Sequence, residues 1–259
     1  MANRRPRPIH PRLAQARRYE AAIRRTYLDP VFRRFTSQLA HVSALNQVWG
    51  ALAAGLRATE ALPRAGVPIE MIEHHLDRIR DYHRERVLST FRSAFGVNIA
   101  PLLTEPQIAE FMAGKVAENV DLIKTIPRRS HDGLAAKIRN ELVEAPFDQQ
   151  RLMGMVQREY KVEGWNLRRI TRDQTSKMIG QLTEIRHRQL GIERYIWETA
   201  GDERVRETHS QNSGLVFAWG APPDTGPPGA EILCRCVATP LISSIDRTRL
   251  VEAVAEGAV

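Results

Sequence analysis

The sequence is poor in cysteine, in lysine and in long apolar runs, and each shortage excludes a class of protein. Two cysteines in 259 residues cannot form a disulfide framework, which is typical of a cytosolic chain. No stretch approaches the roughly 18 uninterrupted apolar residues of a membrane span, and the N-terminal arginines precede no apolar signal segment. At 42% hydrophobic and 26% charged residues, the composition is nevertheless that of a folded protein with a sizeable core.

The positive charge is concentrated at the N-terminus. Residues 1–36 contain ten arginines and two acids, a surplus of eight that accounts for the whole net charge of +8. Arginine outnumbers lysine 33 to five, which favours bidentate contacts with phosphate or carboxylate. Prolines among the first arginines predict an extended arm, which binds DNA phosphates or an acidic protein surface, or else is a tail with no fixed partner. The candidate contact residues are Arg4, Arg5, Arg7, Arg12, Arg17 and Arg18.

Apolar residues recur every three or four positions through most of the chain, a pattern that predicts helices. The first helix, over residues 12–27, is expected to stop before the Asp29-Pro30 pair. The next is expected to bury one face made of Leu39, Val42, Leu45, Trp49, Leu52 and Leu56. Further helices are predicted over 69–92, from Thr104 to a stop at Pro127, from Ser130 to near Pro146, and from Asp148 to Gly191 with an interruption around Gly164.

The pattern changes near residue 192, where short β-type runs alternate with glycine and proline. Residues 192–199 and 215–219 are predicted strands. The predicted fold class is therefore α+β, with a predominantly helical N-terminal region followed by a small mixed α/β C-terminal module. The predicted divisions are a basic arm with the first helix (1–36), a helical domain (37–149), the C-terminal module (150–242) and a tail (243–259).

The C-terminal module contains the residues with most chemical potential. Cys234 and Cys236 are the two cysteines of the chain, and a disulfide between positions i and i+2 would be strained. On a strand they would share a face, so that two thiolates, His209 and Asp202 would complete four zinc ligands. The alternatives are two buried thiols beside an ordinary histidine, a thiol nucleophile with His209 as base, and Asp202 as a helix cap.

The order of residues in this module is more specific than any one of them. It runs through Tyr195, Trp197, Thr199, Asp202, Arg204, Val205, Arg206, His209, Gly214, Phe217, Trp219, Pro228, Gly229, Cys234, Arg235, Cys236 and Pro240, preceded by Arg169 to Thr175 and Leu190-Gly191-Ile192. Residues 150–242 with this pattern resemble the phage Mu F-like head morphogenesis family. The preceding residues match that family only in being helical.

The resemblance implies a minor capsid protein of a tailed phage or prophage, located in the virion head and not an enzyme. Its implied partners are the portal protein and other capsid components, with double-stranded DNA as a further partner of the arginine-rich N-terminus. No membrane and no small-molecule substrate are expected. The family's Asp, His and Cys-x-Cys positions fall on Asp202, His209, Cys234 and Cys236, which favours a structural zinc.

Two rival functions remain open at this point. The first is a zinc-dependent hydrolase acting on nucleic acid or protein, which would keep an open coordination position at the zinc. The second is a plain DNA-binding protein that uses the N-terminal arm alone, for which the cysteines would matter little.

Overall fold

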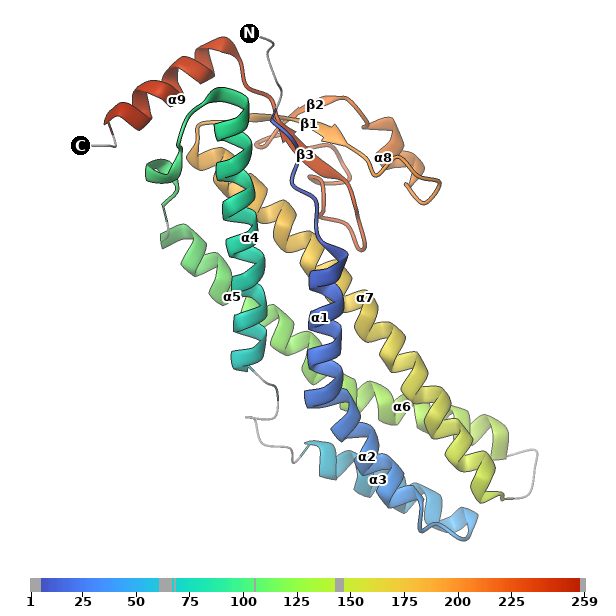
Figure 1. Ribbon diagram of the computed structural model, residues 1–259. Coiled ribbons are helices and arrows are strands. Elements are labelled where there is room, and N and C mark those ends of the chain that lie inside the picture. The colour runs from blue at the N-terminus through green and yellow to red at the C-terminus, as the bar shows by residue number, and fades with distance from the viewer. Residues whose placement is uncertain (1–5, 61–66, 68, 105, 143–146, 257–259) are drawn as a thin grey trace. The chain divides into compact units, whose positions relative to one another are not determined.

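The computed structural model describes residues 6–60, 67, 69–104, 106–142 and 147–256 (Figure 1). The protein is 69% helical with a small three-stranded antiparallel sheet near the C-terminus, so the predicted α+β class is confirmed. The chain forms two compact units, one made of Met1–Gln15, His74–Lys115 and Arg172–Val259, the other of Ala16–Glu73 and Val116–Thr171. Both units are discontinuous in sequence, whereas the predicted divisions at 36, 149 and 242 are sequential and stay a prediction.

In the unit made of Ala16–Glu73 and Val116–Thr171, helices are the only regular secondary structure among the described residues. The chain stays helical where a stop was predicted, because the π-helical turn η1 (Arg24–Leu28) joins α1 (Leu13–Ile23) directly to α2 (Asp29–Leu39). The prediction failed because a π-helical turn precedes Pro30, in which the Asp29 N–H bonds the Arg24 carbonyl, and the chain remains helical into α2. Tyr160 of the long helix α7 (Gln149–Gln189) donates to the Asp29 carboxylate at 2.8 Å and meets the Phe32 ring edge-on.

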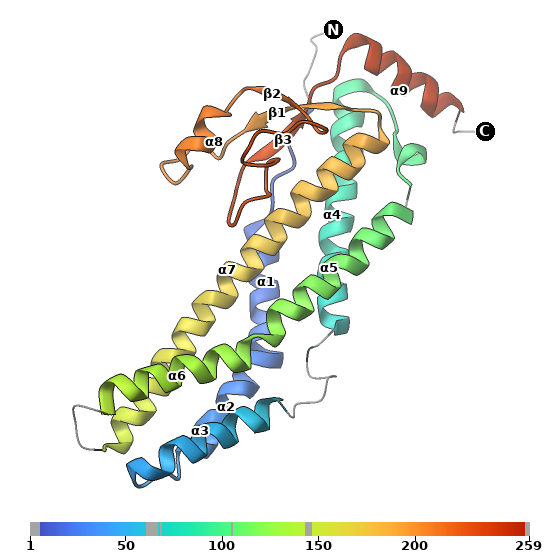
Figure 2. The same cartoon turned by 180° about the vertical axis from the view of Figure 1, so that it is seen from behind.

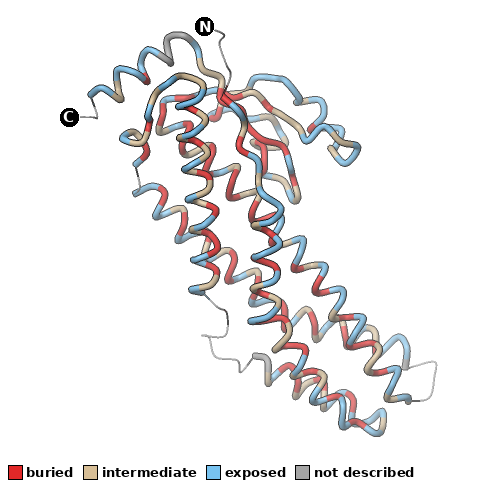
Figure 3. Tube along the Cα trace, viewed as in Figure 1, coloured by how far each residue is buried: buried red, intermediate tan, exposed pale blue. Residues whose placement is uncertain are grey.

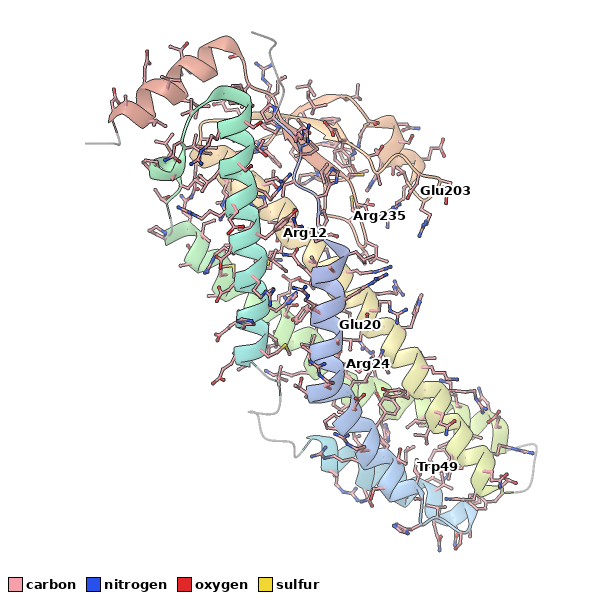
Figure 4. All side chains as sticks on the ribbon, in the orientation of Figure 1. Arg12, Glu20, Arg24, Trp49, Glu203 and Arg235 are labelled. Atoms are coloured by element: carbon pink, nitrogen blue, oxygen red, sulfur yellow. The ribbon has the colours of Figure 1, made fainter. Side chains whose placement is uncertain are left out.

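The expected face from Leu39 to Leu56 was wrong in part, because Leu39, Val42, Leu52 and Leu56 are buried as predicted but do not lie on one continuous helix. The helix breaks after α2, and α3 (Leu45–Glu60) starts afresh, which rotates its buried face onto Val48, Leu52 and Leu56. Leu45 and Trp49 are each 42% exposed as a result, and Trp49 is labelled in Figure 4.

Two of the later helices differ from the prediction, α6 in its start and α7 in its continuity. After α5 (Pro106–Lys124), α6 (Ile126–Leu142) already starts at Ile126, so that Pro127 opens a helix instead of closing one. α7 passes through Gly164 without a break. A Cβ at Gly164 would lie 2.5 Å from Nη2 of Arg24, so a larger residue there would have to displace the end of that flexible side chain.

The other unit combines parts of α4 (Ile69–Phe95), α5 and α7 with the sheet, the short helix α8 (Glu207–Gln211) and α9 (Ser244–Glu256). Strand β1 (Arg194–Glu198) lies between β2 (Val216–Ala218) and β3 (Val237–Pro240), antiparallel to both. The two predicted strands are confirmed. β3 was not predicted, because its proline is typical of a loop, but Pro240 ends an edge strand and has no ladder bond to donate. Gly191 ends α7 with φ +69°, as predicted.

A buried polar contact joins α4 to the C-terminal part of α7, which lie side by side in Figures 1 and 2. Arg186 Nη1 donates to His83 Nδ1 at 2.7 Å, and His83 Nε2 donates to Thr183 Oγ1 at 2.9 Å. Burial, followed by the nearby Arg186 charge, holds the pKa of His83 well below its ordinary value, so the imidazole is neutral. Figure 3 shows the buried residues running along both helices.

The described part of the N-terminal arm is extended and packs on α4. Pro6 and Ile9 are buried, and the Tyr82 hydroxyl donates to the His10 carbonyl at 3.2 Å. The Arg12 guanidinium lies 4.4 Å from the centroid of the Tyr82 ring (Figure 4). This segment therefore has a fixed partner within its own chain. Among the described residues, no helix is both long and apolar enough to cross a membrane.

Candidate metal centre

The sheet, α8 and the loop before β3 together enclose a small aromatic core. Its buried members are Tyr195 and Trp197 on β1, then Trp219, Cys234, Cys236 and Ala238. His209 of α8 packs edge-on against Trp197, with the ring centroids 5.4 Å apart. The imidazole and the two thiols therefore lie in apolar surroundings, where a polar group needs a partner.

Three ligand atoms converge in this core. The Sγ atoms of Cys234 and Cys236 each lie 3.5 Å from Nδ1 of His209, and all three atoms are within 4.8 Å of one another. All three residues are buried, at 2% exposed for His209, 3% for Cys234 and 7% for Cys236. Both cysteines are free thiols. They lie in the loop before β3, whereas the sequence pattern had suggested a strand.

The spacing of these atoms fits a zinc ion. With Zn–S near 2.3 Å and Zn–N near 2.0–2.1 Å, the sulfur-to-nitrogen edge of a tetrahedron is about 3.6 Å. The observed distance of 3.5 Å from each Sγ to Nδ1 matches that edge. Two thiolates and one imidazole are also the donor set that zinc prefers. The residues present therefore fit the ion that was predicted from the sequence.

Glu231 orients the histidine. Its Oε2 atom lies 2.9 Å from His209 Nε2 and 3.0 Å from Nη1 of Arg206. With Nε2–H donating to this carboxylate, Nδ1 keeps the lone pair that faces the two sulfurs. A carboxylate behind a ligating histidine is a usual outer partner at zinc sites. Sequence reasoning missed Glu231, because no spacing relates it to a histidine 22 residues earlier.

The two thiols differ in acidity. The pKa of Cys234 is lowered to about 6, first by the hydrogen bond from Cys236 and then by backbone N–H groups, against the opposing effect of burial. One of those donors is Gly229, whose N–H lies 3.4 Å from Cys234 Sγ. The pKa of Cys236 is raised by sharing that hydrogen bond with Cys234 and by burial. Cys234 is therefore the more acidic thiol of the pair.

The loop that carries the cysteines is fixed to α7. Asp173 of α7 accepts a hydrogen bond from the Leu233 N–H at 2.7 Å, and Leu233 has the left-handed φ of +58°. Gly180 of α7 lies so close to the loop that a Cβ on it would be 2.6 Å from the Pro228 carbonyl oxygen. Asp173 thus stabilises a strained backbone next to Cys234. Asp173 lies within the Arg169 to Thr175 segment of the sequence pattern, but nothing in the sequence indicated this role.

Asp202, the predicted fourth ligand, is not brought into this group. Its carboxylate forms a two-pronged ion pair with Arg235, with both oxygen-to-nitrogen distances at 2.5 Å. That hydrogen bonding lowers the pKa of Asp202 to about 2. Arg235, labelled in Figure 4, is exposed, whereas Cys234 and Cys236 on either side of it are buried, so the ion pair lies outside the group of ligand atoms. The described residues therefore supply three ligand atoms, not four.

The predicted contact arginines are spread along the N-terminal segment. Arg4 and Arg5 lie outside the described residues. Arg7, Arg12, Arg17 and Arg18 are exposed, and Arg12 lies over the Tyr82 ring. Their exposure leaves them accessible to an external partner.

The sequence around this centre matches a known protein family. Residues 119–239 match the family model described as Phage Mu protein F like protein. The resemblance to the Mu F-like family is confirmed. The Mu F-like segment includes the whole ligand group and both outer residues, Glu231 and Asp173. It begins in α5, earlier than the predicted start at 150.

An uncharacterized protein of Haemophilus influenzae is similar to this chain. The two are 31% identical over 160 residues, which cover 61% of this chain. The same alignment covers 36% of the Haemophilus protein, so the chain spans about a third of that relative. No solved structure matches the chain.

Proposed function

We propose that this protein acts in head morphogenesis of a tailed phage or prophage, as a minor capsid protein at or near the portal. The Mu F-like segment carries this proposal, because it contains the complete buried group of His209, Cys234 and Cys236. The portal protein and other capsid components are the proposed partners. The exposed N-terminal arginines suit the phosphates of packaged DNA or an acidic portal surface.

The proposed role of the metal is structural. A zinc held by His209 Nδ1 and the two thiolates would cross-link α8 to the loop before β3, and when bound it supplies folding free energy to a module with few strands. Burial supports this role over the rival zinc hydrolase, because a substrate cannot reach a group at most 7% exposed. Three protein ligands is also the number found at catalytic zinc sites, so activity has to be measured directly.

The metal proposal is tested by elemental analysis of protein purified without chelator. About one zinc per chain is expected, lost together with several degrees of melting temperature in Cys236→Ser and in His209→Ala. His41→Ala, which removes an exposed histidine, is the matched control and should leave both the zinc content and the melting temperature unchanged. The absorption spectrum of the cobalt-substituted protein should show thiolate-to-cobalt bands. Absence of metal with unchanged melting in both site variants would refute the proposal.

The assembly role is tested in heads of the phage that encodes the chain. Mass spectrometry of purified heads should find the protein at a copy number far below that of the major capsid protein. Cross-linking should join it to the portal protein. Heads without the chain, or with it but never cross-linked near the portal, would contradict the role, and zinc-dependent hydrolysis of nucleic acid or protein would favour the rival.

A further inference from the structure

A basic face runs along α7 within the unit that contains Ala16–Glu73 and Val116–Thr171. Its residues are spaced by three, four or seven positions, which places them on one side of a helix. All of them are exposed, and Glu159 and Glu163, the acids in this part of α7, are buried. The members of this face are Arg151, Arg158, Lys161, Val162, Trp165, Arg168 and Arg169.

Part of the charge on this face has no partner within the described residues. Arg158 pairs with Glu141 at 2.9 Å, and Arg168 pairs with Glu20 at 3.2 Å. Among the residues that the structure describes, Arg151, Lys161 and Arg169 form no ion pair. These three cations therefore remain available for an external anion.

The buried acids cannot neutralise the face from behind. Glu159 binds Lys137 of α6, and Glu163 binds Arg129 of α6 at 2.8 Å. Each buried carboxylate is thus already satisfied on the opposite side of α7. The exposed side keeps a net positive field.

An exposed tryptophan lies in the middle of these cations. Trp165 is 56% exposed, and the Arg169 guanidinium lies 4.8 Å from its ring centroid. Stacking on the ring holds the planar guanidinium in place, which lowers the entropy cost of binding an anion with it. Val162 is 44% exposed beside it. A large apolar ring left in solvent among cations is typical of a binding surface.

We propose that this basic face of α7 binds the phosphate backbone of double-stranded DNA without reading its sequence. From Arg151 to Arg169 the helix extends about 27 Å, which corresponds to about eight base pairs of a duplex. A single exposed aromatic ring favours the duplex over single strands, since single-strand binding uses a series of rings on which bases stack. The inference rests on the proposed function in one respect, that a head protein meets packaged duplex.

The test measures binding of the full chain to a fluorescein-labelled 30-base-pair duplex by anisotropy, over a range of salt concentrations. Changing Arg151, Lys161 and Arg169 to Gln together should weaken binding at 0.1 M salt at least tenfold. It should also make the log–log salt slope shallower by about 2–3, since each lost phosphate contact removes about 0.9. The matched control is Arg57→Gln, Lys124→Gln and Arg139→Gln, three exposed residues of the same unit on α3, α5 and α6. The control should keep both affinity and slope nearly unchanged.

Three results would overturn the inference. One is an equal loss in both triple variants, which would mean that only net charge matters. Another is tighter binding to the same-length single strand, with a larger loss in Trp165→Ala than in the triple variant. The third is displacement of the duplex by poly-L-glutamate at equal charge, which would indicate an acidic protein partner. Because incorporation into heads is measured separately, failure of this inference leaves the assembly role standing.

Discussion

The substitution Gly180→Ala has two opposite effects on stability. It should stabilise helix α7 through its higher helix propensity, and it should destabilise the contact between α7 and the loop at the metal centre. Within a helix, alanine is ordinarily more stable than glycine by about 0.5–1 kcal/mol. At Gly180, however, the added Cβ would lie 2.6 Å from the Pro228 carbonyl oxygen, whereas ordinary contact begins at 3.4 Å. The loop must therefore move by several tenths of an ångström, and forced contacts of this kind cost about 1–3 kcal/mol. We expect a net loss of about 1–2 kcal/mol in the free energy of unfolding.

The same change should weaken metal binding. Pro228 precedes Gly229, whose N–H donates to Cys234 Sγ, so displacing the loop disturbs a ligand without removing it. Loss of an outer partner usually reduces metal affinity by about 10- to 100-fold, and we expect the lower end of that range. Urea denaturation measures the stability change, and competition with a chromophoric chelator measures the zinc dissociation constant.

Gly114→Ala is the matched control for this prediction. Gly114 lies inside α5 in the same unit, and no described atom outside its immediate chain neighbourhood lies within 4 Å of a Cβ built there. Alanine should stabilise the protein at this position by about 0.5–1 kcal/mol and leave zinc affinity unchanged. If Gly180→Ala were as stable as Gly114→Ala, the close approach of loop and helix would be refuted.

The remaining predictions concern titration and the residues around the ligands. Burial lowers the pKa of His187 to about 3, so as pH falls this histidine is protonated in the unfolded chain before it is protonated in the folded protein. Unfolding free energy should then drop by about 2 kcal/mol between pH 7 and pH 5 in urea titrations, less so in His187→Leu, and a pH-independent value would refute the assignment. Asp202→Asn breaks the ion pair with Arg235, but elemental analysis should still find about one zinc per chain. Loss of the metal in this variant would show that Asp202 is a zinc ligand. Asp173→Asn should cost about 1–2 kcal/mol in the same denaturation assay, because the Leu233 N–H loses a charged acceptor, and unchanged stability would contradict that role.

Sequence reasoning succeeded where neighbouring residues decide the outcome. The helical periodicity, the glycine that ends α7 and the strands around Trp197 and Trp219 are all local signals, and each was predicted correctly. The grouping of His209 with Cys234 and Cys236 also followed from residue type, since few other side chains in the module bind a soft metal.

The failures occurred where distant contacts decide the outcome. Asp202 has the right chemistry for a ligand, but Arg235 competes for it, and sequence spacing does not reveal an ion pair across 33 positions. The exception is the helix end predicted before Asp29-Pro30, where a local feature, the π-helical turn Arg24–Leu28, lets the chain continue. Glu231 was missed for the same reason as Asp202, because its importance comes from which nitrogen of His209 it meets.

The discontinuous make-up of the unit that holds the metal centre determines when it can form during synthesis. Its pieces are Met1–Gln15, His74–Lys115 and Arg172–Val259, so its earliest piece must wait for its latest piece before the unit can form. The segment with Pro6 and Ile9 is synthesised well before the two cysteines, yet its unit is complete only after the cysteines emerge. Contacts this far apart in sequence close slowly, and they leave the early segment open to other partners during translation.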